Sequence, residues 1–409
     1  MIRISVGSEL RLLAGSEELR IEPVRPYDDS TLEFLDELSK KLLTSGGAYP
    51  DAIAFAFWCR RASIQKLAKE FNEPRARLGL GLAFHITPSN VPINFAFSFA
   101  FGLLAGNANV VRVPSKDFGH IPLICGAIGE LFEDTRFAAI RDRTAFVRYD
   151  RNDAVTTFFS ERSHARVIWG GDETVRHIRS LPSMSRTVDI AFADRFSLCV
   201  LDAPGILALS DNDVKALAHH FYNDTYLMDQ NACSSPHLVI WQGGEKDAAR
   251  RRFWAAVAET ARSKYDFTPI QAVDKYTLFC ENLIDGAHPS QLTIDNKYVY
   301  RARLGESPTA TDHIRGTFGL FYEHDVDSVL EDDVLKNIAD AKCQTLTYFG
   351  VDEAALVNYV VDHHLTGVDR IVPVGKALDI GVYWDGFDIV RSLSRVIFRY
   401  RDIPTSPRI

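Results

Sequence analysis

The sequence predicts an α/β protein built on a parallel, doubly wound sheet. Between residues 77 and 202, short apolar segments that favour strands alternate with longer segments that favour helices. This alternation is typical of a parallel sheet with helices on both of its faces. A chain of 409 residues is also long enough for two domains with sizeable cores.

The elements follow one another in a regular order. The N-terminal region, which precedes the alternating segments, predicts a short strand at 1–5, a helix at 30–43 and a helical stretch at 52–71. The alternating region predicts strands at 80–84, 109–113, 144–149, 165–168 and 197–201. Helices are expected between these strands, at 93–105, 118–132, 154–161 and 174–181. Beyond residue 202 we expect a helix at 211–229 and strands at 238–241, 317–322 and 345–349.

Composition argues against several classes of function. The net charge is −8 and no run of Lys or Arg is present, which disfavours nucleic acid as the main partner. The six cysteines show neither a CxxC pair nor a Cys/His spacing suited to zinc, and a disulfide framework is not expected at this length. No apolar stretch reaches the roughly 18 residues of a membrane span, and no signal-peptide pattern opens the chain. We therefore expect a cytoplasmic protein.

Cys233 is the cysteine whose surroundings best suit a nucleophile. It lies in a turn of small and polar residues, Asn-Ala-Cys-Ser-Ser-Pro-His at 231–237, between an expected helix and an expected strand. The thiolate is the attacking form and must be reachable, and such a junction can leave a thiol open on one side. A small buried cysteine with a purely structural role is the alternative.

Asn90 lies in the segment His-Ile-Thr-Pro-Ser-Asn-Val-Pro at 85–92, before an apolar helix. Asn is strongly preferred at helix N-caps, with Pro92 tolerated in the first turn and Gly106 ending the helix. The side-chain amide of Asn90 could instead donate a hydrogen bond to a developing oxyanion. The residues by themselves favour the cap.

Gly170 and Gly171 follow a predicted strand, at the carboxyl end where parallel sheets bind ligands. Two glycines before a helix let the backbone approach a phosphate. No complete G-x-G-x-x-G motif is present, so an ordinary tight turn is the alternative.

Several motifs together resemble the aldehyde dehydrogenase superfamily. Ser-Asn-Val-Pro at 89–92 is followed by Ala-Gly-Asn-Ala-Asn-Val-Val-Arg-Val-Pro-Ser at 105–115. Within the superfamily, the chain is most similar to the LuxC-type acyl-CoA reductases, the fatty-acid reductase component of bacterial luminescence. The other matching segments are Cys-Ser-Ser-Pro at 233–236, Gln-Thr at 344–345, Gly-Val-Asp-Arg-Ile-Val-Pro-Val-Gly at 367–375, Trp-Asp-Gly at 384–386 and Leu-Ser-Arg at 393–395.

This resemblance implies an aldehyde dehydrogenase-like fold with a Rossmann-type cofactor domain and a second α/β catalytic domain. We assign residues 1–202 to the lead-in and dinucleotide-binding domain and 203–361 to the catalytic domain. Residues 362–409 are expected to pack back on both as a C-terminal segment. The resemblance also implies that Cys233 is the catalytic nucleophile and that Asn90 donates a hydrogen bond to the oxyanion.

The stretch 190–197 departs from ordinary aldehyde dehydrogenases because it contains no glutamate. Those enzymes carry one there, which activates water to release the acyl-enzyme as an acid. Members that use thioesters can dispense with it, since CoA or hydride replaces water. The resemblance thus implies an acyl-CoA reductase that converts a fatty acyl-CoA, or an acyl-protein thioester, into the aldehyde. A CoA-acylating aldehyde dehydrogenase working oxidatively and a non-catalytic scaffold subunit stay open as alternatives.

The expected cofactor is NADPH. NAD-preferring relatives commonly have a glutamate at the position of Lys116, where it binds the adenosine ribose. Lys116, with Arg112 nearby, would instead attract a 2′-phosphate, although both could be solvated surface charges. With Ser115, Gly170 and Gly171 these residues form the expected cofactor site, and no metal is expected. The resemblance further implies an acyl-protein synthetase as partner and a homodimer or homotetramer.

Overall fold

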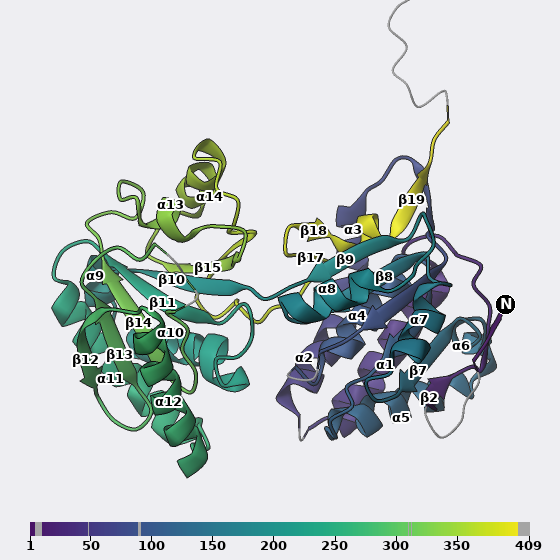
Figure 1. Ribbon diagram of the computed structural model, residues 1–409, viewed down its shortest axis with the longest axis horizontal. Helices are drawn as coiled ribbons and strands as arrows, with labels where there is room; N and C mark the ends of the chain where they lie inside the picture. The colour runs from purple at the N-terminus through teal and green to yellow at the C-terminus, as the bar shows by residue number, and fades with distance from the viewer. Residues whose placement is uncertain (5–9, 48, 89–90, 310, 312, 400–409) are drawn as a thin grey trace, which may run out of the picture. The chain divides into compact units, whose positions relative to one another are not determined.

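The computed structural model describes residues 1–4, 10–47, 49–88, 91–309, 311 and 313–399. The chain divides into two compact units, which are described separately. The first unit comprises Met1–Ala193 and Phe387–Ile409, and the second comprises Asp194–Gly386. Figure 1 traces both, from purple at the N-terminus to yellow near the C-terminus.

The first unit is built on a sheet with the strand order β2-β7-β6-β5-β8-β9 in the described part of the chain. β2 is antiparallel to β7, and all other neighbours pair in parallel. Its strands are β2 (Arg11–Gly15), β5 (Leu82–Ile86), β6 (Ala108–Arg112), β7 (Thr144–Arg148), β8 (Ala165–Trp169) and β9 (Val188–Phe192). Shorter strands in this unit are β1 (Ile2–Arg3), β3 (Glu18–Leu19), β4 (Ala76–Gly79), β18 (Phe387–Asp388) and β19 (Ser394–Ile397).

Helices cover both faces of this sheet. On one face, Phe99 of α4 packs against Phe146 of β7, with ring centroids 4.7 Å apart. On the other face, Phe159 of α7 and Val175 of α8 share a core with Phe84 of β5. The helices are α1 (Asp29–Ser45), α2 (Pro50–Trp58), α3 (Arg61–Phe71), α4 (Asn94–Leu104), α5 (His120–Phe132), η1 (Thr135–Phe137), α6 (Ala138–Arg141), α7 (Asp153–Ser160), α8 (Asp172–Ser180) and α15 (Ile389–Ser392). The predicted doubly wound α/β sheet is confirmed.

The strand order reverses between β5 and β8, which are neighbours in the sheet although β6 and β7 lie between them in sequence. At such a point the loops that leave the two strands run to opposite faces of the sheet. A crevice then opens at the carboxyl ends, where α/β proteins of this kind bind ligands.

The second unit is built on a longer sheet, with the order β12-β13-β14-β11-β10-β15-β16 in the described part of the chain. All neighbours are parallel except β12 and β13. The strands are β10 (Phe196–Asp202), β11 (Pro236–Gln242), β12 (Pro289–Ile294), β13 (Tyr300–Leu304), β14 (Leu320–Asp325), β15 (Cys343–Phe349), β16 (Arg370–Pro373) and the short β17 (Tyr383–Trp384). Its helices are α9 (Ala203–Ala208), α10 (Asp211–Thr225), η2 (Tyr226–Met228), α11 (Lys246–Lys264), α12 (Pro269–Asp285), α13 (Val334–Ile338) and α14 (Glu353–Asp362).

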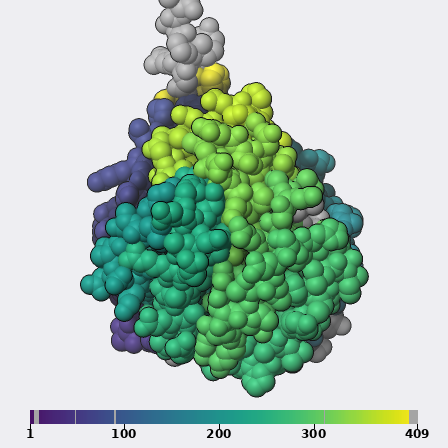
Figure 2. Space-filling model, turned by 90° about the vertical axis from the view of Figure 1, so that its left-hand side faces the viewer, coloured from purple at the N-terminus to yellow at the C-terminus, as the bar shows by residue number. Residues whose placement is uncertain are grey.

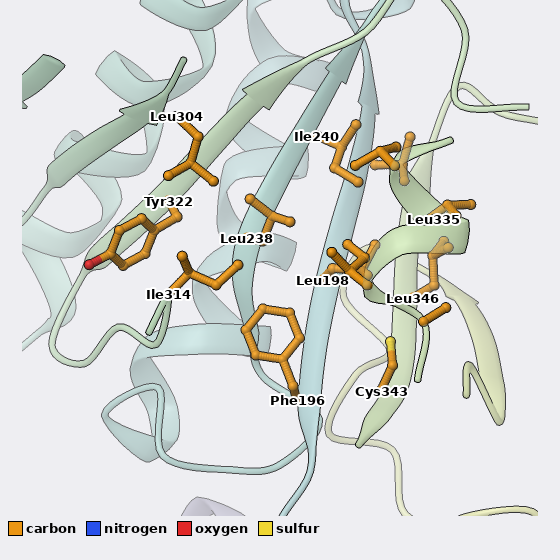
Figure 3. Packing of buried hydrophobic residues seen from close by; sticks show 14 of the residues in the cluster. Phe196, Leu198, Leu238, Ile240, Leu304, Ile314, Tyr322, Leu335, Cys343 and Leu346 are labelled. Atoms are coloured by element: carbon orange, nitrogen blue, oxygen red, sulfur yellow. The ribbon is translucent and has the colours of Figure 1, made fainter. Parts of the chain in front are cut away.

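This sheet also has a core on each face. One core joins Leu198, Leu238 and Leu346 of the sheet to Leu335 of α13, and Figure 3 shows these side chains meeting. The other joins alternate residues of the same strands to α10 and α11. Figure 2 shows one face of this unit, where its teal and green segments lie side by side. Helices on both faces leave the strand ends as the accessible edges of the sheet.

The unit boundary lies between Ala193 and Asp194, whereas the sequence led us to place it after residue 202. The reason is hydrogen bonding, because β10 pairs in parallel with both β11 and β15 and so belongs to the second sheet. The C-terminal segment is divided as well. Its last strand, β19, pairs with β4 of the first unit, and Arg77 donates to the carbonyl oxygens of Arg391 and Ser394.

Two further elements differ from expectation. The helical stretch 52–71 is two helices, because Arg60 has the extended ψ of 140° and turns the chain. The strand expected at 80–84 is interrupted at Gly81, whose φ of +133° favours glycine. A Cβ at this position would also lie only 2.6 Å from the His164 side chain. Helix α4 has Ile93 at its N-cap, with no side-chain capping bond.

Candidate active site and cofactor cleft

A cleft of about 680 Å³ opens in the first unit at the carboxyl ends of β5, β6 and β8. Its volume lies within the usual range for small-molecule sites. The five residues expected at the cofactor site all line it, namely Arg112, Ser115, Lys116, Gly170 and Gly171. The structure thus brings together, at the reversal of strand order, residues that are up to 59 positions apart in sequence.

The cations of the cleft lie on one side of it. The Arg112 guanidinium lies 4.6 Å from the ring centre of Tyr149, and the Lys116 ammonium lies 5.2 Å from that of Phe118. Within the described residues neither cation is in an ion pair with a carboxylate, so both charges are available to an anion. The arrangement therefore fits a phosphate group held near the end of β6.

The glycine turn forms the opposite side of the cleft. Gly171 is the N-cap residue of α8, and a Cβ on it would meet nothing within 4 Å, so its backbone is open to a ligand. The first turn of α8 already carries Asp172 and Glu173, which offset the partial positive charge of the helix end. This side of the cleft therefore offers close backbone approach, and the positive charge comes from Arg112 and Lys116. Together the two sides fit a dinucleotide.

Cys233 lies in the second unit, in the loop that leads into the amino end of β11. Its side chain is only partly buried, unlike the fully buried cysteines 59, 125, 199 and 343. Its backbone carbonyl accepts a hydrogen bond from the Ser197 hydroxyl at 2.6 Å, and that hydroxyl accepts from the Thr345 N–H at 3.1 Å. The amino ends of β10 and β15 thus hold the cysteine loop in place.

The surroundings of Cys233 keep its thiol protonated. Burial is the main cause that raises its pKa, and the negative charges of Asp385 and Asp194 raise it further. The backbone N–H of Arg195 and the charge of Arg315 act in the opposite direction. A thiolate at this position is therefore scarce near neutral pH, and a reaction at Cys233 needs a group that takes its proton.

His237 is close to Cys233 in sequence but does not face it. Its ring is buried, with Nδ1 at 3.0 Å from the carbonyl oxygen of Gly316, and it stacks on Phe196. Burial and the charge of Arg315 lower the pKa of His237 to about 3, so the ring is neutral.

Sequence reasoning did not assign a role to Asp385 and Arg195, which act on the Cys233 thiol, or to Gln344, which contacts Asp385. The Gln344 side-chain amide donates to the carboxylate of Asp385, and Arg195 forms an ion pair with Asp369. Gln344 and Asp385 do fall within the motifs that suggested the family. The sequence signal for Asp385 was its Asp-Gly pair, which by itself indicates only a tight turn.

Asn90, the expected oxyanion donor, lies outside the described residues. No group of three His, Cys, Asp or Glu side chains that could hold a metal occurs in the described ranges. None of the helices described here is long and apolar enough to cross a membrane.

Known structures with a similar fold are aldehyde dehydrogenases and a related oxidoreductase. Aldehyde dehydrogenase 21 from Physcomitrella patens has a TM-score of 0.62 at 12% identity, covering 90% of this chain and 84% of its own. An oxidoreductase from Marinobacter aquaeolei has a TM-score of 0.61 at 12% identity, with coverage of 93% and 87%. Lactaldehyde dehydrogenase from Escherichia coli has a TM-score of 0.55 at 14% identity, with coverage of 84% and 76%. These similarities confirm the predicted aldehyde dehydrogenase-like fold.

The family is shown by the sequence itself. Residues 17–277 match the profile of the family described as acyl-CoA reductase (LuxC), and the chain therefore belongs to this family. The resemblance noted in the sequence is confirmed. The protein is an oxidoreductase of a family that reduces fatty acyl groups to aldehydes with a nicotinamide cofactor. No curated protein sequence gives a significant match.

Burial of His237 predicts a loss of stability in acid. In the unfolded chain this side chain takes up a proton near its ordinary pKa of 6.5, whereas in the fold it stays neutral until about 3. The stabilising contribution is therefore complete above 6.5 and is lost as the pH falls towards 3. At about pH 4.5 the loss from this residue reaches about 3 kcal/mol.

Urea unfolding at neutral pH and at about pH 4.5 measures this effect. The His237→Asn variant should lose less stability between the two conditions than the wild type. Equal losses in both proteins would show that His237 is not the source of the acid sensitivity.

Proposed function

We propose that this protein reduces a fatty acyl thioester to the aldehyde with NADPH, through an acyl-enzyme on Cys233. The observation that supports this best is the placement of Cys233. Of the six cysteines, it is the one that combines partial exposure with a loop anchored by two strand ends and with charged groups acting on its thiol. A cysteine must be reachable to act as a nucleophile, and partial exposure on an anchored loop meets this requirement.

In the proposed reaction, the Cys233 thiolate attacks the thioester carbonyl of acyl-CoA and expels CoA, which leaves the acyl group on the cysteine. The Cys233 backbone N–H and the Asn90 side-chain amide would stabilise the oxyanion. When bound, the reduced nicotinamide supplies the hydride for this acyl group. Cys233 is released as a thiolate when the aldehyde leaves.

The lack of a water-activating base supports reduction over hydrolysis. The stretch 190–197 contains no glutamate, and its one carboxylate, Asp194, is held by both terminal nitrogens of Arg315 at 2.9 and 3.1 Å. The oxygens of this carboxylate are thus both engaged with Arg315. The acyl-enzyme would therefore persist until hydride arrives.

Covalent labelling tests this function. Incubation with radiolabelled acyl-CoA in the absence of NADPH should label the wild type at Cys233, and the Cys233→Ala variant should stay unlabelled. The Cys280→Ala variant, which removes the other partly exposed cysteine, serves as the control and should label normally. Equal labelling of the Cys233→Ala variant would contradict the assignment, and turnover by the isolated protein would exclude a scaffold role.

The preference for NADPH is proposed from the cations of the cleft. Because Lys116 and Arg112 line the same cleft and, within the described residues, neither is in an ion pair with a carboxylate, a 2′-phosphate would meet two cations free to bind it. A charge-assisted contact of this kind contributes about 1.5–3 kcal/mol, which is about 10- to 100-fold in binding.

The Lys116→Glu variant should therefore lower the ratio of kcat/KM for NADPH to that for NADH by about 10- to 100-fold. The control is Lys336→Glu, which makes the same change of charge at a lysine outside the cleft and should leave the ratio unchanged. No change with Lys116→Glu would mean that this lysine is a solvated surface charge.

The proposed substrate is an acyl-CoA, or an acyl-protein thioester, of medium to long chain. An acyl-protein synthetase would be the partner that supplies the acyl group, and the protein would work as a dimer or tetramer. A series of acyl-CoAs of increasing length, assayed by NADPH oxidation, should give its highest kcat/KM beyond the short acyl groups. Best turnover on acetyl- or succinyl-CoA would contradict this substrate class.

A further inference from the structure

Asp385 occupies an unusual position for a turn residue. It lies in the two-residue turn between β17 and β18, where Asp385 has a φ of +48° and Gly386 one of +74°. Asp-Gly is a preferred pair for tight turns of this kind, which usually lie on the surface. Here Asp385 is only 7% exposed, and its carboxylate accepts a hydrogen bond from Gln344, which is 1% exposed. A buried acidic side chain at a turn indicates a role beyond turn formation.

The turn is connected to the nucleophile through one set of strand ends. Gln344 and Thr345 are adjacent at the start of β15, and the Thr345 hydroxyl donates to the Gln344 side-chain oxygen at 3.2 Å. The Thr345 N–H donates to the Ser197 hydroxyl, which donates in turn to the carbonyl of Cys233. Gln344, which holds the carboxylate, and Thr345, which is joined to the cysteine loop through Ser197, are thus adjacent residues of β15.

Charge also connects the two groups. The Asp385 carboxylate is the strongest influence on the Cys233 thiol after burial, and it raises the pKa of that thiol. Burial raises the pKa of Asp385 itself to about 6. The other groups that act on Asp385 are Arg195, Gln344 and Arg370, which lower its pKa, and Asp369, which raises it.

A carboxyl group with these properties suits proton transfer near neutral pH. It is ionised above about pH 6 and can accept a proton, yet it holds that proton more firmly than an ordinary aspartate would. The thiol of Cys233 needs such an acceptor, since its own surroundings disfavour the thiolate. His237 is neutral and faces Gly316, so it does not supply one.

We propose that Asp385 is the acid–base residue of the acyl-transfer step, taking the proton of Cys233 and passing it to the departing CoA. This inference rests on the proposed acyl-enzyme at Cys233 and assigns the proton within it. The direct contact between carboxylate and thiol, or one bridging water, would form in the substrate complex, as is common for acid–base groups that stand apart in the free enzyme.

The step balances without any further reactant. The S–H bond of Cys233 breaks, and its proton goes to the Asp385 carboxylate. A new bond forms between the cysteine sulfur and the acyl carbon, while the bond from that carbon to the CoA sulfur breaks. The proton on Asp385 then moves to the CoA thiolate, which leaves as the thiol and restores the carboxylate.

The Asp385→Asn variant tests the proposal in two measurements on the full chain. The rate of acylation by radiolabelled acyl-CoA, measured without NADPH, should fall by about 100-fold or more. The pH midpoint of Cys233 alkylation by iodoacetamide should shift down, because removal of the negative charge makes the thiol more acidic. The control is Asp327→Asn, an exposed aspartate that follows β14 at the carboxyl edge of the same sheet, and both measurements should match the wild type.

The outcomes separate this proposal from simpler roles. If Asp385 only suppressed the thiolate, the variant would be acylated and alkylated faster than the wild type, which would overturn the assignment. If the residue only maintained the turn, both reactions would slow together, and that result would overturn it as well. A wild type that is not acylated at Cys233 would instead refute the proposed function itself.

A second variant keeps the carboxylate and changes its pKa. The acylation rate of the wild type should fall as the pH drops through about 6, where Asp385 becomes protonated. Because the hydrogen bond from Gln344 lowers the pKa of Asp385, the Gln344→Met variant should move this acidic limb to higher pH. An acidic limb that stays in place in Gln344→Met would contradict the proposal.

Discussion

The hydroxyl group of Ser197 is the contact on which the candidate active site depends. It donates to the carbonyl of Cys233 and accepts from the N–H of Thr345, and so it joins three segments at the amino ends of β10, β11 and β15. Ser197 is fully buried, where an unmade hydrogen bond is costly. The backbone of the cysteine loop is therefore held by the ends of parallel strands.

Burial at this site acts on two groups at once. It raises the pKa of the Cys233 thiol, which disfavours the thiolate, and it raises the pKa of the Asp385 carboxyl, which strengthens this group as a proton acceptor in its proposed role. The stretch 190–197 lacks a glutamate that could activate water, which fits the proposed reduction rather than hydrolysis.

The first unit uses a different edge of its sheet. Its cleft opens at carboxyl ends, where the strand order reverses between β5 and β8, and it presents Arg112 and Lys116 beside an open glycine backbone. Asn107 fixes the strand that enters this crevice, because its side chain accepts from the N–H groups of Leu80 and Gly81 and donates to the carbonyl of Leu393. The segment around Leu393 thereby supports the strand on which the cleft is built.

The sequence by itself determined the α/β class, the alternation of the first unit, the family and five of the residues that line the cleft, because apolar periodicity and local motifs are short-range properties. It also singled out Cys233 from the small residues beside it. Tertiary structure decided that β10 belongs to the second sheet, since strand partners come from segments more than thirty residues away. It also decided the role open to Asp385, an ordinary turn residue in sequence, because its proton affinity comes from burial and from charges brought together by the fold.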